Sequence, residues 1–253
     1  MALFERYGTT LYYEELGSPT GYPVLLLAPG SFQSSIVWWH EAGPETDPTV
    51  YLARDFRLIA MDQRNAGKSR ALITASDRWH SFTEDHVALL DYLKIDSVHL
   101  VGACIGVSFI LRLIQVQPWR VSAAVLQQPI GTLKLKASAS GGFLSWRKGL
   151  EGHPEATEEV LDGYQTNLYA HDFVYAVSRD FVRSCSTPLL ILPGDDQAHP
   201  HEIAQEIAQL APNNEFIADW KEGQAREAAF KRVREFLLAH VPTGTQAGRA
   251  RRA

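Results

Sequence analysis

The feature that most constrains the fold is the sequence GACIG at residues 102–106, which lies between two apolar runs. Residues 97–101 predict a buried strand and residues 105–115 predict a helix, so this pentapeptide predicts a sharp strand-to-helix turn. Glycines at 102 and 106 allow the strand and helix to approach closely and tolerate the strained backbone that such a turn requires. The turn would project the Cys104 side chain and place the amide of Ile105 at a helix N-terminus, which favours a thiolate and can stabilise an oxyanion.

Short apolar runs alternate with amphipathic stretches along the rest of the chain. Strands that are apolar throughout and separated by helices predict an α/β fold, with a mostly parallel central sheet and helices on both faces. Ligands of such sheets bind beyond the carboxyl ends of the strands. The expected strands are 24–28, 56–61, 97–101, 121–126, 188–192 and 216–218, and the expected helices are 83–93, 105–115, 201–210 and 226–239.

Composition limits the classes of partner. The 253 residues are 45% hydrophobic, which suffices for one large core without disulfides, and the chain has only two cysteines. A net charge of −5 argues against nucleic acid or an anionic membrane surface as the main partner. The N-terminal residues lack the pattern of a signal peptide, and the longest apolar runs are too short to span a membrane. We therefore expect a cytoplasmic protein that acts on a small molecule without a cofactor or metal ion. Both a monomer and a homodimer are compatible with the sequence.

Residues 132–187 interrupt the alternation of strands and helices. This stretch begins with small residues, offers helical segments near 154–168 and 171–185, and is rich in aromatic side chains. It predicts a small helical lid, inserted between core segments 1–131 and 188–241, while 242–253 would form a flexible tail. We expect the substrate to contact Phe32, His80, Trp146 and Phe173.

Three further segments extend the pattern around Cys104. They are APGS at 28–31, DQRNAGKS at 62–69 and GDD at 194–196. Together with the turn at 102–106, they resemble the α/β-hydrolase superfamily, with cysteine where its nucleophile elbow usually carries serine. The resemblance implies that backbone amides of Ser31 and Ile105 form an oxyanion hole, with Phe32 as an alternative to Ser31. It also implies that Asp196, with Asp195 as second choice, is the catalytic acid, although a surface turn rich in aspartate would look the same.

The histidine that such a nucleophile needs is absent from its usual place. In the superfamily it follows the last strand, where this chain reads DWKEGQ at 219–224. His199, beside the candidate acid, is the best alternative, although an ordinary loop role is also open. His240 follows the last helix and is expected to face solvent. Asp195, Asp196, His199 and His201 match no standard zinc spacing, so a metal centre is not expected.

Three hypotheses about function follow. The first is hydrolysis of an ester, thioester or lactone in a small apolar substrate, with Cys104 as nucleophile and with His199 and Asp196 transferring the proton. The second is a lyase or cyclase that uses the same pocket without an acyl-enzyme. The third is a ligand-binding protein on this scaffold, in which Cys104 would be inert.

Overall fold

A computed structural model describes residues 2–41, 43, 47–131, 141–150, 152–169 and 173–243. Within these residues, eight strands form one sheet in the order β1-β2-β4-β3-β5-β6-β7-β8. The strands from β3 onward pair in parallel, whereas β1 and β2 pair antiparallel to each other and β2 pairs antiparallel to β4. The strands are β1 (Ala2–Arg6), β2 (Thr9–Gly17), β3 (Tyr22–Leu27), β4 (Phe56–Met61), β5 (Val98–Ala103), β6 (Val121–Gln127), β7 (Leu189–Leu192) and β8 (Asn214–Phe216).

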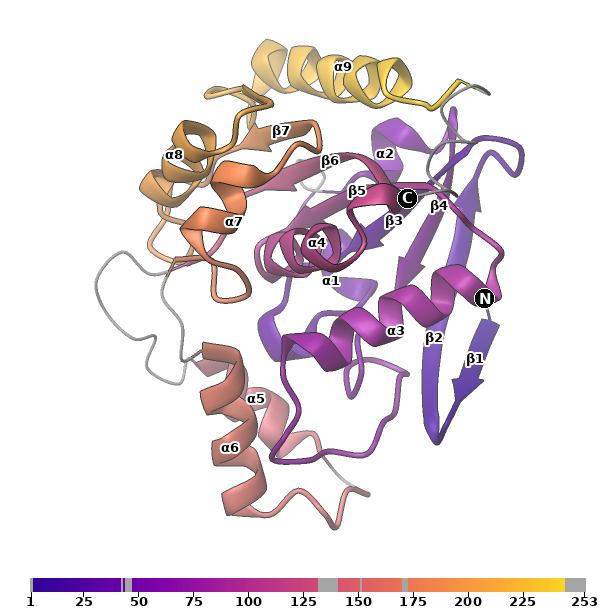
Figure 1. Cartoon of the computed structure of the whole chain (residues 1–253), viewed down its shortest axis with the longest axis vertical. Helices are drawn as coiled ribbons and strands as arrows, with labels where there is room; N and C mark the ends of the chain where they lie inside the picture. The colour runs from indigo at the N-terminus through magenta and orange to yellow at the C-terminus, as the bar shows by residue number, and fades with distance from the viewer. Residues whose placement is uncertain are drawn as a thin grey trace.

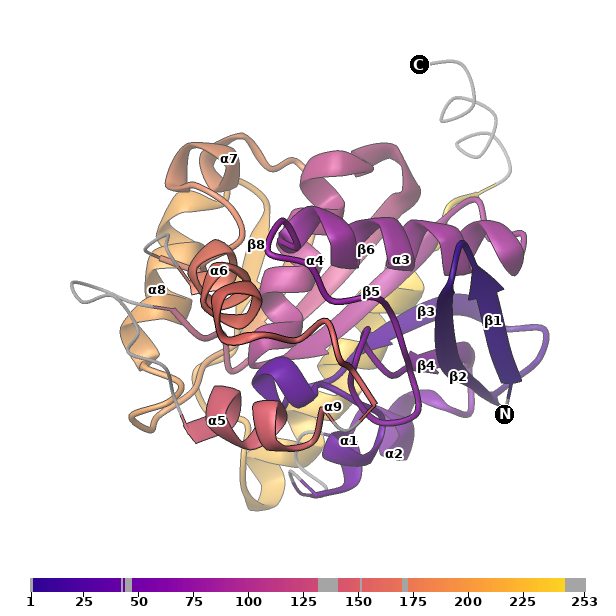
Figure 2. The ribbon, with the colours of Figure 1, turned by 90° about the horizontal axis from the view of Figure 1, so that it is seen from below.

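Helices cover both faces of this sheet. Figure 2 shows α3 and α4 on one side, and α1, α2 and α9 on the other. Figure 1 places α5 and α6 at the end of the molecule opposite α9. The helices are η1 (Ser31–Gln33), α1 (Val37–Glu41), α2 (Thr49–Leu52), α3 (Trp79–Tyr92), α4 (Ile105–Val116), η2 (Pro118–Arg120), α5 (Gly141–Lys148), α6 (Glu158–Tyr169), α7 (Arg179–Ser184), α8 (His201–Leu210) and α9 (Gly223–Ala239).

The apolar strands are buried on both sides, as the expected α/β class requires. Along β3, Leu25 and Leu27 pack into the core beneath α3, α4 and α8, whereas Val24 and Leu26 pack into the core beneath α2 and α9. Successive side chains of a strand point to opposite faces, so an unbroken apolar run supplies both cores. The expected fold class is therefore confirmed.

Two regions differ from the sequence expectation. The β1–β2 hairpin was not expected, because in β2 only the consecutive residues Leu11, Tyr12 and Tyr13 are buried and no alternating pattern marks the strand. The helix expected over 171–185 is confined to α7. Phe173 and Tyr175 have φ angles of 64° and 62°, a left-handed conformation that cannot continue an α-helix.

The insertion after β6 contains α5, α6 and α7. Its first part, residues 132–140, lies outside the described residues, as does most of the expected tail from residue 244 onward. In the described part of the chain, no helix has the length and apolar character needed to cross a membrane.

Candidate active site

The turn at Cys104 has the strained geometry that the sequence predicts. Cys104 lies between β5 and α4 with φ 57° and ψ −120°, and its backbone N–H donates to the carbonyl oxygen of Gln127 at 3.0 Å. A Cβ atom on Gly106 would lie 1.9 Å from the carbonyl oxygen of Leu27, so only glycine fits there. This packing holds a non-glycine residue at positive φ and leaves the Cys104 side chain partly exposed at the end of the sheet.

The loop between β7 and α8 holds the acid and the histidine together. His199 Nδ1 lies 2.9 Å from Asp196 Oδ2. Asp196 Oδ1 also accepts the backbone N–H groups of Ala198, at 2.7 Å, and of His199, at 2.9 Å. The turn is so tight that a Cβ atom on Gly194 would lie 2.3 Å from the Cβ atom of His199. The carboxylate therefore fixes both the imidazole and the backbone that carries it.

His199 also meets Cys104. Burial disfavours the imidazolium, but the interactions of His199 with Cys104 and Asp196 outweigh burial and raise the pKa of His199 to about 9. Because Nδ1 faces Asp196, Nε2 is the ring nitrogen left for the thiol. The structure thus brings together the three residues that the sequence proposed as nucleophile, base and acid.

The loop that usually carries the histidine is occupied by other interactions. Trp220 is buried, and its Nε1 donates to the carbonyl oxygen of Pro193 at 2.8 Å. Lys221 forms an ion pair with Asp195, so this second candidate acid is turned toward a lysine rather than a histidine. His240 contacts the carbonyl oxygen of Phe236, on its own helix.

Ser31 and Ile105 line one small cavity beside the elbow. Its volume is about 10 Å³, roughly enough for one water molecule. Ser31 has a φ of 55°, follows β3 directly and opens η1, while Ile105 opens α4. The remaining lining is almost entirely apolar and aromatic: Phe32, Trp79, Phe82, Phe109, Leu168 and Tyr169.

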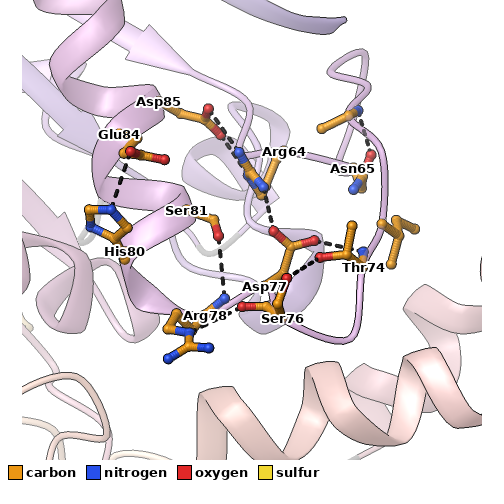
Figure 3. Close-up of polar contacts among 12 residues, drawn as sticks. Arg64, Asn65, Thr74, Ser76, Asp77, Arg78, His80, Ser81, Glu84 and Asp85 are labelled. Atoms are coloured by element: carbon orange, nitrogen blue, oxygen red, sulfur yellow. Dashed lines mark hydrogen bonds and ion pairs between the residues drawn. The ribbon is translucent and has the colours of Figure 1, made fainter. Parts of the chain in front are cut away.

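Of the four residues expected to contact substrate, only Phe32 belongs to this lining. Trp146 is buried, and its ring stacks on Phe32 with 5.3 Å between centroids. Phe173 is buried beneath the guanidinium of Arg179. His80 does not reach the site: it lies on the exposed surface of α3, 3.2 Å from Glu84 (Figure 3).

The sequence did not identify the core residues that line the cavity. Phe109 lies four residues after Ile105 on α4 and so shares its helix face, a spacing that could have revealed it. Tyr169 and Tyr175 were visible only as members of an aromatic-rich insertion. Both phenols interact electrostatically with Cys104, and burial raises the pKa of each, for Tyr175 to about 12.

Arg64, in the turn at 62–69, is the centre of a buried ion-pair network. Arg64 donates to both carboxylate oxygens of Asp85, at 2.7 and 3.0 Å, and to Asp77 at 2.8 Å (Figure 3). The neighbouring Asn65 accepts the indole N–H of Trp146 through its backbone oxygen at 2.7 Å. The turn at 62–69 therefore links α3 to the insertion.

Among the described residues, no three histidine, cysteine, aspartate or glutamate side chains gather in a way that could hold a metal ion. The carboxylates and imidazoles of the 195–201 loop instead find partners within the protein. His201, for example, faces the carbonyl oxygen of Gly194.

Comparison with known proteins identifies the family. The family model of the alpha/beta hydrolase fold matches residues 23–162, more than half of the chain. The chain therefore belongs to the α/β-hydrolase family, which agrees with its sheet and its elbow.

Individual relatives are more distant. The chain is 31% identical over 174 residues to a probable proline iminopeptidase of Leptolyngbya boryana, covering 64% of this chain and 51% of the relative. It is 34% identical over 116 residues to a putative carbamate hydrolase, RutD, of Variovorax paradoxus, covering 46% and 41%. These matches span about half or less of the relatives' own lengths.

Solved structures agree on the fold. The enol-lactonase of Burkholderia xenovorans LB400 superposes with a TM-score of 0.64 over 94% of this chain and 100% of its own, at 19% identity. This likeness concerns the architecture alone.

Proposed function

We propose that this protein hydrolyses an ester, thioester or lactone bond in a small apolar substrate, with Cys104 as the nucleophile. The observation that carries the proposal is the contact of Cys104, at a strained elbow, with His199, which Asp196 holds at 2.9 Å. A nucleophile in reach of a base that a third group orients is the arrangement required for covalent catalysis.

In the first half-reaction, the Cys104 thiolate attacks the carbonyl carbon and the carbonyl electron pair moves to oxygen. The backbone N–H groups of Ser31 and Ile105 donate to this oxyanion. The intermediate collapses, the bond to the leaving alcohol or thiol breaks, and His199 gives that group its proton. With a pKa raised to about 9, the imidazole carries this proton at neutral pH.

In the second half-reaction, water must be activated. Acylation converts the attacking thiolate into a neutral thioester and so removes the interactions with Cys104 that help to raise the pKa of His199. The imidazole can then take a proton from water, whose oxygen attacks the thioester carbon. Breaking of the C–S bond releases the acid and restores the thiolate beside a protonated His199.

The cavity and the relatives support the choice of substrate. Apolar and aromatic side chains form most of the lining, so an uncharged acyl group fits better than a charged one. The two relatives named above are described as a probable proline iminopeptidase and a putative carbamate hydrolase, both of which break bonds to a carbonyl carbon. We also propose that α5, α6 and α7 form a lid over this cavity.

The test is turnover of p-nitrophenyl acetate and butyrate by the wild-type protein, Cys104→Ala and the control Cys185→Ala. We expect an acyl mass on Cys104, a loss of about 10³-fold or more in Cys104→Ala, and wild-type rates in the control. Turnover that survives Cys104→Ala would point to chemistry without an acyl-enzyme. Saturable binding of these esters without turnover would point to a binding protein.

A further inference from the structure

The cavity beside the elbow contains one polar side chain that the proposed mechanism does not use. Tyr169 is the last residue of α6, and its hydroxyl lies 2.8 Å from Oγ of Ser31. Tyr169 lines the same cavity as Ser31 and Ile105, and its phenol interacts with the charge of Cys104. Residues from three distant segments of the chain, Ser31, Ile105 and Tyr169, therefore line one cavity that adjoins the elbow.

We propose that Tyr169 is a third oxyanion donor, supplied by the insertion, so that the oxyanion hole is complete only when α6 is packed against the core. The proposal rests on the proposed function. It adds a catalytic residue to that function and gives the insertion a chemical role besides covering the substrate.

The chemistry requires a hydroxyl that donates without losing its proton. As Cys104 attacks, the electron pair of the C=O double bond moves to oxygen, and the phenol O–H donates to that oxygen. When the intermediate collapses, the pair returns and the hydrogen bond weakens. Burial raises the pKa of Tyr169, so the phenol keeps its proton at every stage.

The contact with Ser31 orients this donor. Either hydroxyl can donate in that pair. If Oγ of Ser31 donates to the phenol oxygen, the phenol hydrogen is free to point into the cavity, toward the substrate oxygen. Ser31 thereby has two roles in the proposed mechanism, since its backbone N–H is one of the other proposed donors.

The end of α6 is fixed to the core immediately before Tyr169. Asn167 Nδ2 donates to the backbone oxygen atoms of Ala75, at 2.8 Å, and of Asp77, at 3.1 Å. Trp79 Nε1 donates to the backbone oxygen of Leu168 at 3.1 Å. A donor held by contacts at the two preceding residues is preorganised, which is the property that makes oxyanion donors effective.

Tyr175 provides a matched control. Its ring centroid lies 4.8 Å from that of Tyr169, and its phenol too interacts with Cys104. Among the described residues, Tyr175 does not line the cavity, and the hydroxyl that pairs with Ser31 is that of Tyr169. A general effect of removing a phenol near the nucleophile would appear in both tyrosine variants.

The experiment compares Tyr169→Phe and Tyr175→Phe in pre-steady-state acylation by p-nitrophenyl butyrate. We expect Tyr169→Phe to lower the acylation rate constant on the order of 10²-fold with little change in KM, and Tyr175→Phe to stay within a few-fold of wild type. Alkylation of Cys104 by iodoacetamide, which forms no oxyanion, should proceed at the wild-type rate in Tyr169→Phe. If that variant does not fold, Ser31→Ala, which keeps its backbone N–H, should slow the same step to a lesser degree.

Unchanged acylation in Tyr169→Phe, or an equal loss in Tyr175→Phe, would overturn the role of Tyr169 and leave the nucleophile in place. A slowed alkylation in Tyr169→Phe would also overturn it, because the residue would then act on the thiol. Turnover that survives Cys104→Ala contradicts the proposed function itself, and the role of Tyr169 with it.

Discussion

His199 differs from the histidine of the usual arrangement in its place along the chain, because it lies on the same loop as its acid. Only two residues separate it from Asp196, and that carboxylate also accepts the backbone N–H of His199 at 2.9 Å. A single tight turn therefore sets both the imidazole and its partner. In the proposed mechanism no histidine is needed beyond β8, where the buried Trp220 packs.

The first prediction concerns the proton on His199. The pKa of an unperturbed histidine is near 6.5, whereas the pKa of His199 is raised to about 9. Interactions that raise the pKa of a histidine stabilise the folded protein. This stabilisation is fully present below pH 6.5 and is lost as the pH rises through 9. We expect the unfolding free energy to fall by roughly 2–3 kcal/mol between pH 6.5 and 9.5, measured by urea denaturation.

His199→Gln serves as the comparison for this pH dependence. Its unfolding free energy should vary much less over the same interval, since the titrating group is gone. The lowered pKa of Asp196 affects stability only in acid and leaves this window undisturbed. An equally steep decline in His199→Gln would mean that another group is responsible.

The second prediction tests the tightness of the 194–199 turn. In Gly194→Ala the new methyl group would meet the Cβ atom of His199 at 2.3 Å, so the imidazole must move. We expect ester turnover to fall by roughly tenfold or more, since small displacements of catalytic groups are costly. Gly149→Ala is the control, because its nearest contact, at 3.4 Å, is ordinary. Equal activity in the two variants would show that the position of His199 is not critical.

Among the elements, the turn at 62–69 connects parts of the fold that are distant in sequence. The guanidinium of Arg64 is largely buried and binds two carboxylates, one on α3 and one on the preceding loop. Removing one partner of a buried network leaves uncompensated charges, which is expensive. The network therefore stabilises the region from which Trp79 and Asn65 contact the insertion.

The third prediction follows from this network. We expect Arg64→Ala to lower the unfolding free energy by about 3–5 kcal/mol, because Asp77 and Asp85 would stay buried without a counter-charge. Arg183→Ala, which removes an exposed pair with Asp180, should cost about 1 kcal/mol or less. Chemical denaturation of both variants measures the difference, and similar losses would contradict a structural role for the buried network.

Elements with strong local signals could be predicted from the sequence. The parallel strands are apolar throughout, and the elbow combines two glycines with a strand and a helix, so their positions follow from residues close in the chain. The β1–β2 hairpin and the segment at Phe173 lack such signals. The first is held by pairing with β4 and the second by left-handed backbone within the insertion.

The site was predictable to the same extent. Cys104, Asp196 and His199 could be named because each follows a strand, and the carboxyl ends of parallel strands share one edge of the sheet. The position of Tyr169 could not be derived. It depends on how the end of α6 packs on Trp79, an interaction between residues 89 positions apart.

At the scale of the whole molecule, the cavity beside the elbow lies between the core and the insertion, and it is small. A cavity of about 10 Å³ has no space for an acyl group, so substrate must displace part of the wall. Leu168, on α6 of the insertion, and Phe109, on α4 of the core, both line the cavity. The size of the substrate that the protein accepts should therefore depend on residues of both the core and the insertion.

The fourth prediction concerns a substitution that enlarges the cavity. Leu168→Ala should move the preference among p-nitrophenyl esters from short toward longer acyl chains, measured as kcat/KM from acetate to octanoate. The substitution should also cost about 2–5 kcal/mol of unfolding free energy, because Leu168 is buried. Leu144→Ala, at an exposed position on α5, is the control and should alter neither quantity. An unchanged chain-length preference in Leu168→Ala would place the acyl group elsewhere.

The most direct test of a Cys104–His199 pair needs no substrate. Iodoacetamide alkylation is followed by mass spectrometry, reading Cys104 and the buried Cys185 separately in the wild type and in His199→Gln. Burial raises the pKa of Cys185, which makes it a slow internal standard. We predict that Cys104 reacts much faster than Cys185 at neutral pH and that His199→Gln slows it roughly tenfold or more without affecting Cys185. Equal rates at the two cysteines, or a Cys104 rate that His199→Gln leaves unchanged, would contradict the nucleophile assignment.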